Sequence, residues 1–201
     1  MASEVDLCNL ALAHLGDTAT VASLDPPEGS AQAEHCARFF PIARDSLLEM
    51  HPWKFATRRV LLAQLATETW NWGFAYAEPA GVIKLLAVLP PSAASDAETK
   101  EYEAETDGNG MPIILTNQEN ASLRYIAHVT DTTVFSPLFA MALSWHLASM
   151  LAGPLLKGEA GAAEAKRCTA VMSGYLAQAT LSDSSQRRIK PEQNVGWINN
   201  R

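Results

Sequence analysis

Five histidines, three cysteines and an acidic repeat are the residues of this chain whose types could support catalysis or metal binding. None of the histidines has a carboxylate or a second histidine at the spacing of a metal-binding motif such as HExxH. A metal site is therefore not expected. The histidines are His14, His35, His51, His128 and His146.

Glu101, Glu103 and Glu105 occupy alternate positions, so in a strand they share one face and repel each other. This pattern favours a solvated strand face over an acid/base pair or a divalent-cation site. The cysteines, Cys8, Cys36 and Cys168, lie far apart without CxxC spacing and fall on apolar helical stripes, which indicates packing as small hydrophobes. The sequence thus predicts no catalytic residue and no cofactor.

Aromatic residues are the remaining candidates for function, and most of them lie in the middle of the chain. They could stack nucleic-acid bases or anchor a core and a subunit interface. The net charge of −7 and the sequence pI of about 5.2 favour anchoring, because a strong phosphate binder needs a basic surface. The predicted core or interface aromatics are Trp53, Phe55, Trp70, Trp72, Tyr76 and Trp145.

Helical periodicity positions both ends of the chain. A chain of 201 residues with 48% hydrophobic content can form one domain with a sizeable core, which we place at residues 1–181. Helices are expected within 1–56 and 136–180, the first opened by a capping box of Ser3 and Asp6. Pro41 is expected to kink or split the second helix, and Gly153-Pro154 to close the third. No apolar run appears long enough to span a membrane.

Between the two helical regions, at about 57–132, short apolar or alternating runs separated by turn residues predict strands. Val82 to Leu89 is one strand, and Asp107 to Gly110 forms a hairpin turn. Leu123 to Val129 is the last strand, with Leu123, Tyr125, Ala127 and Val129 on one face and Arg124, Ile126 and His128 on the other. The expected fold is α+β and mainly α: a four-helix bundle with a small antiparallel β-sheet inserted between helices two and three. Residues 182–201 are polar and lack periodicity, which predicts an extended C-terminal tail.

The order of these segments resembles the tail tubular protein A family of bacteriophage head-to-tail connectors. The resemblance rests on EVDLCNLALAHLG, AEHCARFFPIARDSLLEMHPWKFATRRVLL, WNWGFAYAEPAGVIKLLAV and ASLRYIAHVTDTTVFSPLFAMALSWHLASMLAGPL, which together cover most of the chain. Its most specific part is ARDSLLEMHPWKFATRR. The segment Glu78-Pro79-Ala80-Gly81 departs from the family pattern, which affects only the local loop.

The resemblance implies a structural adaptor with no catalytic residues. Its copies would form a ring, expected to be dodecameric, between the portal protein and a downstream tail nozzle or tail terminator protein. Genomic DNA would pass through the lumen without specific binding, which suits an acidic protein, and no membrane is involved. The expected location is the head-tail junction of the virion, and the host cytoplasm before assembly.

Within this interpretation the C-terminal tail is a candidate portal-docking segment, with apolar anchors and basic electrostatic guides. A frayed terminus without a role is the alternative. The candidate docking residues are Arg187, Arg188, Ile189, Lys190, Val195, Trp197 and Ile198.

A second class of function remains open from the sequence: a small cytoplasmic helical protein that binds a ligand or regulates another protein, with the aromatic middle section as its pocket. A stable monomer would favour it. An enzyme of unfamiliar type would need converging titratable groups, and the sequence has no such group.

Overall fold

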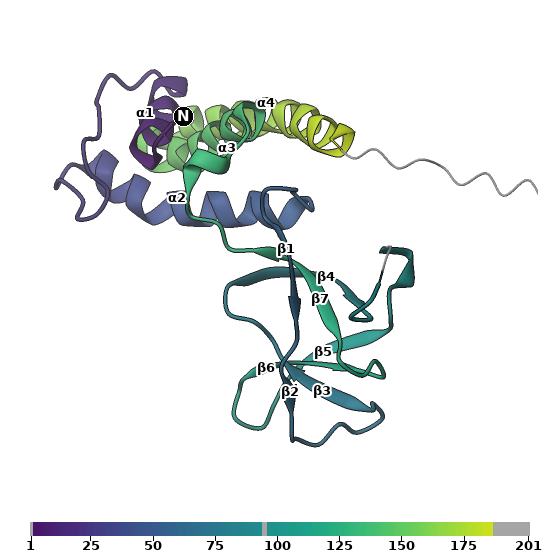
Figure 1. Cartoon of the computed structure of the whole chain (residues 1–201). Helices are drawn as coiled ribbons and strands as arrows, with labels where there is room; N and C mark the ends of the chain where they lie inside the picture. Colours follow the sequence, from purple (N-terminus) through teal and green to yellow (C-terminus); the bar gives the residue numbers. More distant parts are fainter. Residues whose placement is uncertain (1, 94–95, 187–201) are drawn as a thin grey trace, which may run out of the picture.

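The described part of the chain forms a layer of four helices and a β unit on one side of that layer (Figure 1). This architecture comes from a computed structural model that describes residues 2–93 and 96–186. The helices are α1 (Glu4–His14), α2 (Ala31–Met50), α3 (Pro137–Leu156) and α4 (Gly158–Ser185). Two 3-10 segments, η1 (Asp96–Glu98) and η2 (Thr132–Val134), lie in the connections.

Serine caps begin three of the four helices. Ser3 and Asp6 form the predicted capping box of α1, in which each side chain accepts the other residue's backbone N–H. Ser30 caps α2 and Ser136 caps α3, each by accepting a backbone N–H three residues on. Pro41 does not split α2, which continues to Met50; Pro41 is exposed, so water can reach the carbonyl that its missing N–H leaves unpaired.

The predicted ends of α3 and α4 were both too early. α3 passes through Gly153 and Pro154 to Leu156, where the N–H of Lys157 donates to the Gly153 carbonyl and closes the last turn. α4 then continues to Ser185, so the first residues of the predicted tail are helical. Tertiary packing explains the longer α4, because Asp183 in its last turns is buried against the rest of the protein.

α3 is the central helix of the layer and packs on α1, α2 and α4. Its length and mean hydropathy of 1.4 would by themselves allow a membrane span, contrary to the sequence-based expectation. In this fold the apolar side chains of α3 form part of the core instead, and Leu143, Leu147 and Leu151 are fully buried. The four-helix bundle expected from the sequence is thus replaced by a layer in which three helices are arranged around α3.

The β region does not form the single small sheet predicted from the sequence. The strands of the described residues form two antiparallel sheets. One has three strands in the order β1-β7-β4, and the other has four in the order β2-β3-β6-β5. The strands are β1 (Thr57–Leu61), β2 (Gln64–Leu65), β3 (Phe74–Ala77), β4 (Val82–Leu89), β5 (Tyr102–Thr106), β6 (Pro112–Thr116) and β7 (Ser122–Ala127).

The two sheets enclose a core of their own. One small sheet would leave the apolar side chains of this core uncovered. Tyr76, Val88, Ile114 and Leu123 come from both sheets and form one buried cluster. The sheets are joined where β1 runs on into β2 and where an isolated bridge links Val88 to Lys100. The predicted hairpin connects β5 to β6, with the Asp107 N–H donating to the Met111 carbonyl.

β7 connects the β core to the helical core because its side chains alternate between the two. Leu123, Tyr125 and Ala127 face the β core, as the sequence pattern predicted, whereas Ile126 belongs to the buried cluster of the helical layer. Val129, predicted on the same face as Leu123, follows the end of β7 and packs in the helical core instead. The β unit therefore shares a strand with the helical core and is not tethered only by its two chain connections.

Candidate functional site

Within the described residues no group of three or more histidine, cysteine or acidic side chains could hold a metal ion. Cys8 and Cys36 lie side by side in the helical core, where the hydrogen bond with Cys36 and then burial raise the pKa of the Cys8 thiol. Such a thiol is a weak nucleophile.

The predicted aromatic residues do not converge on one site. Trp53 is fully buried in the helical core, with its ring 4.9 Å from that of Phe139 and its Nε1 donating to the Leu47 carbonyl at 2.7 Å. Phe55 packs beside it at 5.1 Å from Phe139. Tyr76 lies in the β core and donates its hydroxyl to the Gln118 carbonyl. These three are core residues.

Trp70 and Trp72 lie on the loop between β2 and β3, at the end of the β unit remote from the helices (Figure 1). Trp70 is 79% exposed and has a positive φ of 50°, which presents a large apolar ring to solvent. Trp72 folds back over the sheet, where its Nε1 donates to the Glu103 carboxylate. Of the six predicted aromatics, Trp70 alone has the exposure that contact with a partner needs.

Trp145 lies in the helical layer in a stack of polar and aromatic groups. Its ring is parallel to that of His14 at 3.6 Å, and the Arg167 guanidinium lies 5.2 Å from its centre. Its Nε1 is buried without a hydrogen-bond partner among the described residues. This arrangement fastens α1 and α4 to α3.

Two of the helical-layer histidines should make stability depend on pH. Burial lowers the pKa of His146 below its ordinary 6.5, and burial followed by the Arg167 charge does the same for His14. The unfolded chain therefore binds more protons in mild acid, so stability is full above pH 6.5 and is lost as the pH falls through the folded-state values. Urea unfolding followed from about pH 8 to about pH 5 should record this loss. A His146→Gln variant should have a shallower pH dependence, and an unchanged slope would contradict the assignment.

A joint between the helical layer and the β unit is formed by residues of the segment ARDSLLEMHPWKFATRR. Arg44 on α2 is only 5% exposed, and its guanidinium lies 2.7 Å from His128 Nε2, just after β7. It also meets Asp45 at 2.8 Å and Glu4 of α1 at 3.7 Å. Lys84 on β4 adds a hydrogen bond to the Glu49 carbonyl at 3.2 Å. A buried arginine needs such partners, so these contacts fix the two units to each other.

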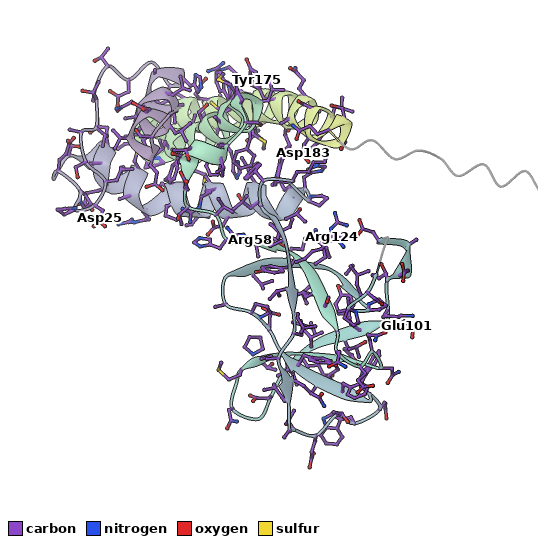
Figure 2. All side chains as sticks on the ribbon, viewed as in Figure 1. Asp25, Arg58, Glu101, Arg124, Tyr175 and Asp183 are labelled. Atoms are coloured by element: carbon purple, nitrogen blue, oxygen red, sulfur yellow. The ribbon has the colours of Figure 1, made fainter. Side chains whose placement is uncertain are left out.

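The same segment also holds the end of α4. Asp183 accepts the backbone N–H of Lys54 at 3.2 Å and lies 3.3 Å from His51 Nε2, while Lys54 Nζ donates to the Asp183 carbonyl. Figure 2 shows Asp183 beside the last turns of α2. Sequence reasoning missed Arg44 and Asp183 as positioning residues, and an isolated aspartate among serines carries no local signal that would have identified it.

The candidate docking residues Arg187, Arg188, Ile189, Lys190, Val195, Trp197 and Ile198 lie outside the described part of the chain. The Asp183 contacts nevertheless fix the end of α4, because the helix ends only two residues further on.

Exposed apolar side chains occur on both units of the molecule. On the helical layer, Leu181 is 72% exposed and Ile42 55%; on the β unit, Leu61 is 61% exposed and Met111 62%. An apolar groove of about 310 Å³ also opens between α1 and the start of α3. It is lined by Ala2, Leu7, Leu10, Phe135, Pro137 and Met141, among others.

A comparison with known protein families finds no family that matches this chain, and no curated protein matches it either.

Proposed function

We propose that this protein is a non-enzymatic structural subunit of a bacteriophage head-to-tail connector, which assembles as a ring between the portal protein and the tail and lets DNA pass. The observation that carries the proposal is the joint at Arg44, whose contact with His128 fixes the β unit to the helical layer, so that two dissimilar units form one body. A connector subunit must hold a different neighbour at each end, and such a body transmits the position of one end to the other.

Three further features support the proposal. Exposed apolar side chains are present on the helical layer, as at Leu181, and on the remote end of the β unit, as at Trp70. The residues of the segment that carries the family resemblance have packing roles, which is what an adaptor without chemistry requires. The net charge of −7 suits a lumen through which DNA slides, because phosphate groups are repelled from it.

The test is to mix the purified protein with the portal protein of the same phage and examine the product by mass photometry and negative-stain imaging. A ring of added density at the narrow end of the portal, of a mass that gives the copy number, is the expected result. A protein that leaves the portal bare would contradict the proposal.

Portal docking by the C-terminal segment is tested in the same assay by a truncation that removes residues 187–201. The truncated protein should keep its fold, because Asp183 and the end of α4 remain, and should lose most of its attachment to the portal. A cut at residue 182 would be a poor test, since it also removes the Asp183 contacts and disturbs the joint. Normal attachment by the protein ending at residue 186 would refute a docking role for the segment.

The apolar groove beside α1 favours one other candidate function, a small-molecule binder. Its volume of about 310 Å³ lies at the lower end of the range of ligand pockets. The pocket is not the aromatic section expected from the sequence, because Trp53 and Tyr76 belong to separate cores. A monomer whose melting temperature rises with an apolar ligand, together with a bare portal, would favour this function.

A further inference from the structure

Of the four edge strands in the described β unit, β2 has only two residues and β4 is met by Lys100, which leaves β1 and β5 as the open edges considered for pairing. β1 pairs with β7 along one side, and β5 pairs with β6 along one side, while no other described strand pairs along their remaining edges. The segment before β5 touches β4 at the single bridge of Lys100 to Val88. β1 and β5 belong to different sheets, so their open edges are two separate surfaces of the β unit. An open edge is a template for pairing with another chain.

The hydrogen-bonding pattern defines which backbone groups of β1 are free to pair. Just after β1, the Leu62 N–H donates to the Ala121 carbonyl beyond β7 at 2.9 Å. In an antiparallel ladder alternate residues point to the same side, so even-numbered residues of β1 face β7. The N–H and carbonyl groups of Arg59 and Leu61 therefore project from the open edge.

The same reasoning applies to β5. At the hairpin the Asp107 N–H donates to the Met111 carbonyl at 2.8 Å, so odd-numbered residues of β5 face β6. The backbone groups of Tyr102, Ala104 and Thr106 consequently project from the other edge of β5. Lys100 uses this same edge to donate its N–H to the Val88 carbonyl of β4, so the edge is open from Tyr102 onward. Ala104 and Thr106 are exposed, which leaves this edge accessible.

The two edges carry opposite charges. β1 contributes Arg58 and Arg59, whereas β5 contributes Glu103 and Glu105, and all four side chains are exposed. Arg59 already pairs with Asp96 of the same chain. Among the described residues Arg58 and Glu105 have no ion-pair partner, so both charges are available to a neighbour. Figure 2 shows Arg58 and Glu101, the residue that precedes β5, on separate sides of the β unit.

We propose that the open edge of β1 in one copy pairs antiparallel with the open edge of β5 in the next copy, joining the two β units into one continuous sheet. The inference rests on the proposed function and names the surface through which the ring forms. Each copy uses its β1 edge in the contact with one neighbour and its β5 edge in the contact with the other. The contact is therefore heterologous and repeats from copy to copy until the ring closes.

The register follows from the lengths and the hydrogen-bonding pattern of the two strands. Overlap of all five residues sets Thr57–Leu61 against Tyr102–Thr106 and places Arg59 opposite Ala104, which both project their backbone groups outward. In this register Arg58 lies opposite Glu105. Leu61, which is 61% exposed in the single subunit, lies opposite Tyr102 and gains an apolar neighbour.

Charge explains why β1 selects β5 and not a second β1. A two-fold pairing of β1 with β1 brings arginines together, and a pairing of β5 with β5 brings glutamates together; both are unfavourable. The heterologous pair matches opposite charges, which fixes the partner and its register. The charges thus disfavour two-fold dimers and favour head-to-tail contacts between successive copies, which a ring requires.

Charge reversal at the Arg58–Glu105 pair tests the proposal on the full-length protein. The variants are Arg58→Glu, Glu105→Arg and the double variant, with Arg58→Glu/Glu103→Arg as a register control, and unchanged melting temperatures should verify their folding. Assembly is measured by sedimentation velocity of the protein alone at millimolar concentration and by mass photometry on the portal. Each single reversal should lower the assembled fraction roughly tenfold. The double variant should restore it, and the register control should not.

The outcomes separate this pairing from the connector function itself. Single variants that assemble as well as the wild-type protein, or a wild-type protein that assembles in neither measurement, would overturn the pairing. Rings on the portal that are insensitive to both reversals would preserve the function and refute the edge contact. Charge-sensitive assembly of the free protein with a bare portal would preserve the edge contact and refute the function.

Discussion

Replacement of Gly161 with alanine is expected to destabilise the fold by about 1–3 kcal/mol. Gly161 lies in the first turn of α4, where the helix approaches α3 closely. A Cβ atom there would lie 2.8 Å from the Ala152 carbonyl oxygen and 3.4 Å from the Gly153 Cα. Both are backbone atoms, so no side-chain rotation can relieve the overlap, and α3 and α4 must move apart. Urea denaturation of the purified variant measures the effect.

Gly174 is the matched control in the same helix. No heavy atom lies within 4 Å of the position its Cβ would take, and its φ is not positive. Gly174→Ala should therefore stabilise the protein by about 0.5–1 kcal/mol, through the higher helix propensity of alanine alone. Equal effects of the two substitutions would show that α4 does not pack on α3 as described.

Replacement of Trp53 with alanine is expected to cost about 3–5 kcal/mol of the free energy of unfolding. The side chain is 0% exposed, and its loss leaves a large cavity beside Phe139 and removes the hydrogen bond to the Leu47 carbonyl. Trp53 also directly precedes Lys54, whose contacts hold the end of α4, so the joint should loosen with the core. Denaturant titration, with tryptophan fluorescence and far-UV circular dichroism recorded in parallel, measures the loss.

Trp70 supplies the comparison for Trp53, because it is a tryptophan that is 79% exposed in the single subunit. Trp70→Ala should change stability by no more than about 0.5 kcal/mol. If the two substitutions cost the same, the assignment of Trp53 to the helical core is wrong. A Trp70→Ala protein of normal stability also allows the contribution of this ring to assembly to be measured separately from folding.

Several local elements could be predicted from the sequence because the interactions that define them span only a few residues. Ser3 and Asp6 exchange hydrogen bonds three residues apart, and Ser136 caps α3 over the same distance. The Asp107 to Gly110 turn likewise connects β5 to β6 by local geometry, with Gly110 at a φ of 79°. These signals need no knowledge of the rest of the fold.

The sheet arrangement could not be predicted in the same way. β1 pairs with β7, so that Thr57 lies opposite Ile126. Several apolar strands could pair with the same edge, and the sequence does not indicate which of them does. Alternation within β7 separates Leu123, Tyr125 and Ala127 from Ile126 as predicted. The prediction was wrong for Val129, which follows the end of the strand and packs in the helical core. The pattern does not indicate that the two faces serve two different cores.

The sequence by itself thus determined where most helices start, which residues of β7 share a face and which turns join neighbouring strands. Tertiary structure alone decided the number of sheets, the length of α4 and the joint between the two units. The contacts of Arg44 with His128 and of Asp183 with Lys54 join residues 84 and 129 positions apart. Such contacts form only when the whole chain has buried its apolar surface, because that burial sets which distant polar groups must find each other.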